Sequence, residues 1–106
     1  MKILKIEFRF DGDGEAFERA FMEAAEPIAQ TPGLKWKIWL WNEETRIGGG
    51  IYLFDNQPSI DSYLNGPIIA GLKKAPPVSD ATIAVYDVVE KPTAVTRGPV
   101  GSTVRA

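Results

Sequence analysis

The sequence predicts an α+β domain, because apolar residues recur with two different periods along the chain. Residues 3–10 alternate between apolar and charged side chains, the pattern of a strand with one buried face. Residues 15–26 instead place apolar side chains every three or four positions, as on one face of a helix. With the later segments, the predicted order is strand, helix, strand, strand, helix, strand. That order is the split βαβ arrangement of a ferredoxin-like fold, a four-stranded antiparallel sheet with its helices on one face.

The first helix has turn signals on both sides. A turn at 11–14 contains two aspartates, either of which is placed to cap a helix beginning at Glu15. Pro27 has no N–H and would clash with the preceding turn, so we expect the helix to kink or end near Glu26. Residues 31–33 then close the connection to the next strand.

Two adjacent strands are predicted in the middle of the chain. Residues 34–41 carry apolar side chains at every even position, while the odd positions hold two lysines and two tryptophans. A polar turn at 42–45 leads to a strand over 46–54. The three consecutive glycines at 48–50 indicate either a bulge or a place where another group approaches the backbone closely.

An interrupted helix and a final strand complete the predicted domain. Residues 59–64 begin a helix that Gly66 and Pro67 interrupt, and residues 68–73 form a second short piece. Residues 81–89 are rich in valine, isoleucine and tyrosine, which favours a strand.

The length of 106 residues suits one domain rather than two. We expect this ferredoxin-like domain to span residues 1–89. Residues 90–106 are rich in proline, glycine and threonine and show no periodicity. We predict that this C-terminal extension packs on a partner subunit.

The composition excludes several classes of chemistry. The chain contains no cysteine and no histidine, which removes disulfides, thiolate and imidazole metal sites, and the catalytic dyads and triads that need either residue. No carboxylates have metal-ligand spacing, so we expect no metal and no cofactor. A net charge of −2 without a basic patch argues against nucleic-acid binding. The charged N-terminal segment and the lack of a long apolar run predict a cytoplasmic protein that does not bind membranes.

The sheet face away from the helices is expected to be an interface. Two helices cover only one face, and we predict that the other face carries Trp39 and Trp41. A second copy packed sheet to sheet would bury this aromatic surface, which predicts a homodimer. The alternative is a monomer whose C-terminal extension folds back over the sheet.

The central block of the sequence resembles a known family. Pro32-Gly33-x-x-Trp36-Lys37-Ile38-Trp39 is followed at matching spacing by Gly49-Gly50-Ile51-Tyr52-Leu53-Phe54 and then by Tyr63-Leu64. This pattern is similar to that of the YdhR-like monooxygenases over about residues 3–89, and the extension after Val89 is longer than the family pattern suggests. The resemblance implies a dimeric α+β barrel, a superfamily that includes small oxygenases acting on aromatic or quinol substrates without metal or flavin.

The resemblance further implies a cofactor-independent monooxygenase, an oxidoreductase acting on a hydrophobic aromatic or quinol-like small molecule. An electron-rich substrate anion can pass an electron to oxygen itself, while the protein supplies an apolar pocket, a stabilising charge and exclusion of water. The electrostatic element is expected to be Lys37. The expected catalytic residues are Lys37, Trp39 and Tyr52, and the expected substrate-binding residues are Trp36, Tyr63 and Asn42.

Each of these residues also has a structural interpretation. Trp36 shares its alternation with Leu34 and would then be part of the core or a pocket wall. Trp39 would pack at the subunit interface, and Lys37 would be an edge charge that discourages stray strand pairing. The tyrosines would be ordinary packing residues, and Asn42 would make local hydrogen bonds in its turn.

Two other functions use the same fold. A non-catalytic small-molecule binding protein would need the same pocket but no oxygen chemistry, so ligand binding without turnover identifies it. A protein–protein assembly module would leave no cavity of about 300 Å³ or more between helices and sheet.

Overall fold

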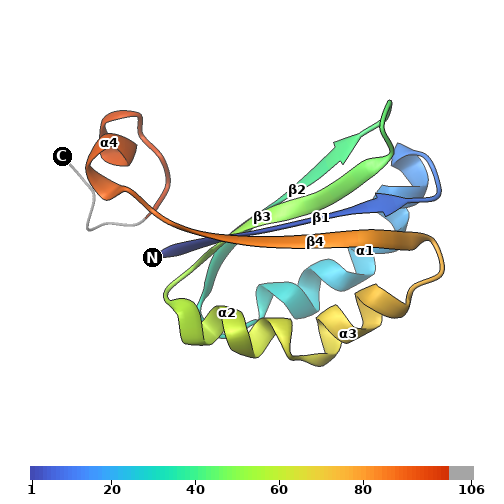
Figure 1. Ribbon diagram of the computed structural model, residues 1–106, viewed down its shortest axis with the longest axis horizontal. Coiled ribbons are helices and arrows are strands. Elements are labelled where there is room, and N and C mark those ends of the chain that lie inside the picture. The colour runs from blue at the N-terminus through green and yellow to red at the C-terminus, as the bar shows by residue number, and fades with distance from the viewer. Residues whose placement is uncertain (101–106) are drawn as a thin grey trace.

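The computed structural model describes residues 1–100 of the chain. It consists of one sheet, a layer of helices and a C-terminal helical segment (Figure 1). The elements are β1 (Lys2–Phe10), α1 (Gly14–Ala29), β2 (Leu34–Asn42), β3 (Ile47–Phe54), α2 (Gln57–Leu64), α3 (Pro67–Lys74), β4 (Val78–Asp87) and α4 (Glu90–Val95).

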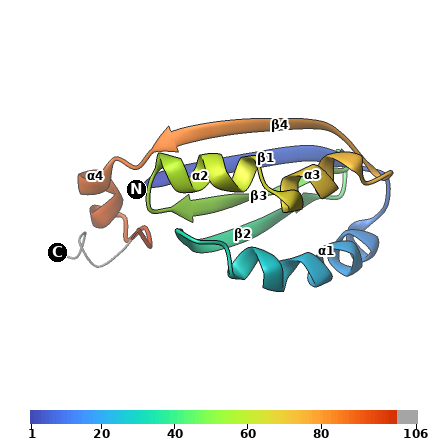
Figure 2. The ribbon, with the colours of Figure 1, turned by 90° about the horizontal axis from the view of Figure 1, so that it is seen from below.

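The sheet is antiparallel throughout and has the strand order β2-β3-β1-β4. This order and the βαββαβ sequence of elements confirm the predicted ferredoxin-like arrangement. Helices α1, α2 and α3 all cover the same face, with α1 along β2 and α3 against β4 (Figures 1 and 2). The opposite face carries no helix from α1 to α3.

The core lies between the sheet and these helices. The alternation in β1 places the side chains of Leu4, Ile6, Phe8 and Phe10 in this layer, as predicted, and burying each contributes about 1.5–3 kcal/mol. A cluster of aromatic rings fills the end near the start of α1, where Phe17 stacks on Trp41 at 4.8 Å between ring centroids. The main buried residues are Leu4, Ile6, Phe8, Phe10, Phe17, Ile28, Tyr52, Phe54, Ile60, Tyr63 and Ile69.

Helix α1 begins as predicted but ends later. The Asp13 side chain caps it by accepting a hydrogen bond from the backbone N–H of Ala16. The helix continues through Pro27 to Ala29, so of the expected kink or end near Glu26 the end is wrong. Proline is tolerated here because the last turn is held by the buried side chain of Ile28, which packs in the core.

The faces of β2 differ from the prediction. Trp39 and Trp41 do not lie on the uncovered face: Trp39 packs 5.7 Å from the Phe21 ring of α1, and Trp41 stacks on Phe17. The register explains this, because the two tryptophans pair across the strands with Gly50 and Gly48, which face the helices. The missing side chain of Gly48 leaves room for the indole ring of Trp41, and that of Gly50 leaves room for the side chain of Lys37 beside Trp39.

A register shift between Leu34 and Trp36 places the side chains at the start of β2 on different faces of the sheet from those that strict alternation predicts. Leu34 pairs with Phe54 and packs against the core, whereas Trp36 pairs with Leu53 on the uncovered face. The predicted sharing of one face by Leu34 and Trp36 is therefore wrong, because a bulge breaks the period of two.

The glycine run in β3 marks close approach and not a bulge. The pairing of β3 with β1 runs without a shift from Ile47 to Phe54. A side chain on Gly49, which has a φ of 150°, would collide with the backbone carbonyl of Ile6. A Cβ on Gly50 would lie 2.5 Å from Cε of Lys37. The glycines thus admit neighbouring groups from both flanking strands.

The C-terminal extension is partly helical and folds against its own chain. Helix α4 lies beyond the end of the sheet at which β4 finishes (Figure 1). The Trp36 indole N–H then donates to the carbonyl oxygen of Pro99 at 2.7 Å, and Val100 is buried. The predicted contact of residues 90–106 with a partner subunit stays a prediction, and its residues 101–106 lie outside the described part. In residues 1–100, no helix is long and apolar enough to span a membrane.

Substitutions at two glycines test the close approach at β3. We expect Gly49→Ala to lower the free energy of unfolding by about 2–4 kcal/mol, because it adds both a steric clash and an unfavourable φ. Gly71→Ala in α3 is the matched control: its added Cβ meets no atom within 4 Å, so we expect about 0.4–1 kcal/mol of stabilisation. Urea denaturation followed by tryptophan fluorescence measures both. Equal effects of the two substitutions would contradict this account.

Candidate functional site

A cavity of about 350 Å³ lies between the helices and the sheet. Its walls are predominantly apolar, which is typical of small-molecule sites. The space exists because several residues that face it are too small to fill it: Ala20 and Ala24 of α1, Gly71 and Ala75 at α3, and Gly49 and Gly50 of β3. The larger side chains around it are Ile6, Phe8, Phe21, Ile28, Ile68 and Leu72.

Lys37 is the one charged side chain among the described residues that line this cavity. Its Nζ lies 3.3 Å from the centroid of the Trp39 ring and 4.4 Å from that of Tyr52, so the amine contacts two aromatic faces. None of the five ion pairs within residues 1–100 involves Lys37. Burial without an acidic partner lowers the pKa of Lys37 from 10.5 to about 7.

Two buried tyrosines supply the other polar atoms of the cavity wall. The hydroxyl oxygens of Tyr52 and Tyr63 lie 3.0 Å apart and share a hydrogen bond. Burial raises the pKa of both tyrosines, and the proximity of Tyr63 raises that of Tyr52 further, so both stay protonated at neutral pH. Their mutual bond uses only one of the two hydroxyl hydrogens. The other hydrogen is left to donate to a ligand.

The cavity brings together four of the six predicted site residues. Lys37, Trp39, Tyr52 and Tyr63 all line it. The cross-strand pairing of Lys37 with Tyr52, and the position of Tyr63 on α2 beneath β3, bring the polar groups together. The roles predicted for these residues are proposals that are developed below.

The other two predicted residues lie elsewhere. Trp36 is on the uncovered face of the sheet, where its indole N–H bonds to the extension. Asn42 is in the β2–β3 turn, and its side-chain oxygen accepts the backbone N–H groups of Glu44 and Thr45 at 3.0 and 3.1 Å. Neither side chain lines the cavity.

The site residues predicted from the sequence did not include the parts of α1 and α3 that line the cavity. Phe21 and Ala24 of α1 and Ile68 and Leu72 of α3 close the cavity over the sheet. Their helical spacing indicates a buried face. The small residues at positions 20, 24 and 71 of these buried faces are the one sequence feature that could have indicated a cavity.

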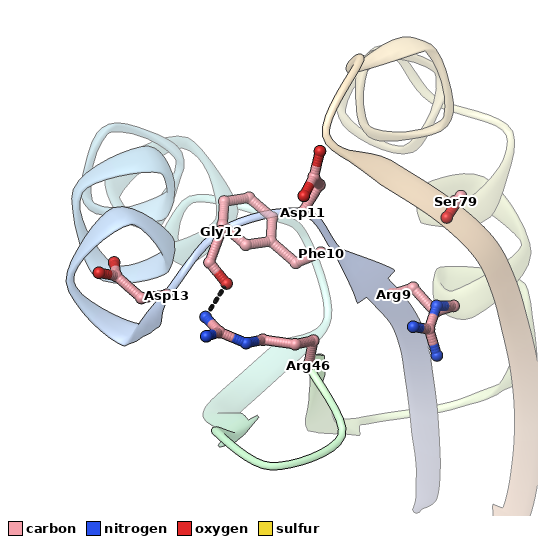
Figure 3. Close-up of a pocket in the computed structure, with 7 residues that line it drawn as sticks. All are labelled: Arg9, Phe10, Asp11, Gly12, Asp13, Arg46 and Ser79. Atoms are coloured by element: carbon pink, nitrogen blue, oxygen red, sulfur yellow. Dashed lines mark hydrogen bonds between the residues drawn. The ribbon is translucent and has the colours of Figure 1, made fainter.

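A second, larger cleft of about 620 Å³ lies at the start of α1 (Figure 3). It is open and polar, and two of its charged side chains have structural partners. The Arg46 guanidinium donates to the carbonyl oxygen of Gly12 and forms an ion pair with Glu43 at 3.1 Å, while Asp13 caps α1. This arrangement ties the β2–β3 turn to the β1–α1 turn, so we assign the cleft a structural function.

The fold and the cavity define a class: a ferredoxin-like α+β protein with an apolar cavity between sheet and helices. Residues 3–99 match the family model described as "Putative mono-oxygenase ydhR". The chain therefore belongs to the ydhR monooxygenase family. The match continues past Val89 to residue 99, so the family pattern covers more of the extension than the predicted range of about 3–89.

Solved structures show the same fold at low sequence identity. SnoaB from Streptomyces nogalater, described as a cofactor-independent oxygenase, is 16% identical with a TM-score of 0.65, covering 85% of this chain and 94% of its own. A protein from Deinococcus radiodurans described as a "putative antibiotic biosynthesis monooxygenase" is 18% identical with a TM-score of 0.65, covering 85% of this chain and 94% of its own. The heme degrader MhuD from Mycobacterium tuberculosis is 20% identical with a TM-score of 0.63 over 82% and 95%. None of the curated proteins matches the chain.

The buried amine makes stability depend on pH. Between pH 7 and 10 the unfolded chain holds a proton on Lys37 that the folded protein has lost, so stability rises with pH across this window. We expect a rise of about 1–3 kcal/mol between pH 7 and 9. Above about pH 10 the raised pKa of Tyr52 reverses the trend, because the unfolded tyrosine ionises first.

Variants at two lysines of β2 test whether Lys37 causes this pH dependence of stability. Lys37→Met is expected to abolish the rise between pH 7 and 9 and to be the more stable protein at pH 7. Lys35→Met removes an exposed lysine paired with Asp55 and should keep the rise. Denaturation at each pH gives the free energies, and parallel curves for wild type and Lys37→Met would refute the assignment.

Proposed function

We propose that this protein is a cofactor-independent monooxygenase acting on a hydrophobic aromatic or quinol-like small molecule. Membership of the ydhR monooxygenase family supports oxygen chemistry. The observation that carries the finer proposal is the apolar cavity in which one amine without an acidic partner contacts two aromatic rings. Such a cavity suits a flat substrate that carries one acidic hydroxyl.

Lys37 is the proton acceptor in this proposal. With a pKa of about 7, its neutral amine can take the proton of a bound phenol or enol, which leaves a substrate anion beside an ammonium group. The ion pair forms where water is scarce, so the attraction between the charges is strong. The free hydroxyl hydrogen of the Tyr52–Tyr63 pair can donate to the same anion.

The substrate anion then supplies the electrons. It passes one electron to oxygen, and the two radicals combine at the ring carbon that becomes oxidised. For a methylene carbon, loss of two hydrogens and gain of one oxygen atom leave the second oxygen atom as water, so no external reductant is needed. The walls formed by α1 and α3 limit the access of water to these intermediates.

Oxygen uptake by chelator-treated protein with a panel of polycyclic phenols and hydroquinones tests the proposal. We expect saturable uptake above autoxidation, abolished by heat denaturation. Lys37→Met should lower kcat/KM at least about tenfold, because base and counter-charge are both lost. Lys35→Met on the same strand should retain activity. No uptake, but quenching of tryptophan fluorescence by the same compounds, would instead identify a small-molecule binding protein.

We also propose that two copies pack through their uncovered sheet faces. This face carries Trp36, Ile38, Leu40 and Ile51, and the side chain of Ile38 is 52% exposed in one chain. An apolar surface of this kind is typical of an interface, and a homodimer would bury it. The cytoplasmic location and the assembly role expected from the sequence stay predictions.

The dimer is tested by sedimentation velocity. Ile38→Asp places a charge in the proposed interface and is expected to convert the dimer to a monomer. Met22→Asp is the control, because Met22 is 64% exposed on α1, on the other side of the sheet. A monomeric wild type, or a dimer that survives Ile38→Asp, would contradict this interface.

A further inference from the structure

The amine of Lys37 has the surroundings of a nucleophile. The cavity that holds it offers no carboxylate, and its contacts are the faces of Trp39 and Tyr52. Burial favours the neutral form, and only a neutral amine has the free electron pair that attacks an electrophile. A desolvated lysine in an apolar pocket is a known way to activate this group.

The other six lysines of the chain have different surroundings. Three are paired with carboxylates: Lys2 with Asp87, Lys5 with Glu7 and Lys35 with Asp55. The remaining three are exposed: Lys73 and Lys74 at the end of α3, and Lys91 in α4. Lys37 is thus distinguished from every other lysine by its place in the wall of a cavity large enough for a small molecule, without a carboxylate partner.

We propose that Lys37 captures aromatic aldehydes and ketones as covalent imines inside this cavity. The amine nitrogen adds to the carbonyl carbon, and proton transfer gives a carbinolamine. The carbinolamine loses its hydroxyl group as water, and a C=N bond replaces the C=O bond without oxidation or reduction. This reactivity is independent of oxygen chemistry and extends beyond the proposed monooxygenase function.

The rest of the cavity suits this reaction. The shared hydroxyl bond leaves one hydrogen of the Tyr52–Tyr63 pair to donate a hydrogen bond to the departing oxygen, while the proton on the amine nitrogen leaves with that oxygen as water. The aromatic faces of Trp39 and Tyr52 flank the amine, which selects a flat carbonyl compound over a branched aliphatic one. The apolar walls disfavour the return of water that would hydrolyse the imine.

Reductive trapping tests the proposal with the full chain. The protein is incubated with 2-naphthaldehyde and cyanoborohydride at pH 7, where the hydride converts the imine to a stable secondary amine. Intact mass gives the stoichiometry, and peptide mapping gives the site. We expect labelling at Lys37 to be about tenfold or more faster than at any other lysine. The α-amino group of Met1 also reacts near this pH, so its adduct is counted separately.

Variants and a competitor separate capture in the cavity from general amine reactivity. Lys37→Arg keeps a cation but removes the nucleophile and should lose the fast label, whereas Lys35→Arg should keep it. Naphthalene, which has no carbonyl, should slow labelling of wild-type Lys37 by occupying the cavity and leave labelling of Met1 unchanged. This competition uses the wild-type protein, so it does not depend on whether a variant folds. Equal labelling rates at all lysines, or a Lys37 rate that naphthalene does not change, would overturn the proposal.

Discussion

The absence of side chains at three successive positions of β3 is the constraint on which the site depends. Gly48 leaves room for the rings of Phe17 and Trp41, Gly49 for the backbone of β1, and Gly50 for the side chain of Lys37. Any Cβ here would push a neighbouring group away from the sheet. The glycines therefore decide where the large side chains of β2 lie, and with them the shape of the cavity.

The buried amine is a local cost that the rest of the fold must offset. Partly removing an amine from water without an acidic partner disfavours its charged form, and contacts with Trp39 and Tyr52 replace part of the lost hydration. The aromatic cluster at the start of α1 supplies apolar burial nearby. A well-packed aromatic cluster beside a cavity that contains a polar group is typical of proteins in which a functional site lowers the stability of the fold.

The two faces of the sheet have separate functions in this account. The covered face holds the core and the cavity, whereas the uncovered face holds Trp36 and Ile38 and is available to the extension and to a second copy. The bulge beside Trp36 assigns Leu34 and Trp36 to different faces, since it moves the tryptophan away from the face on which Leu34 packs. One extra residue in a strand thus decided whether an aromatic side chain lines the cavity or contacts another part of the chain.

Local pattern in the sequence determined the element order, the buried face of β1 and the family, because strand alternation and motif spacing are properties of neighbouring residues. Tertiary structure alone decided the face of β2, since both of its faces carry large apolar side chains and only pairing with the glycines of β3 selects one. The cavity was decided in the same way. A void is a mismatch between the volumes of side chains on α1, α3 and the sheet, and no single segment of sequence contains that mismatch.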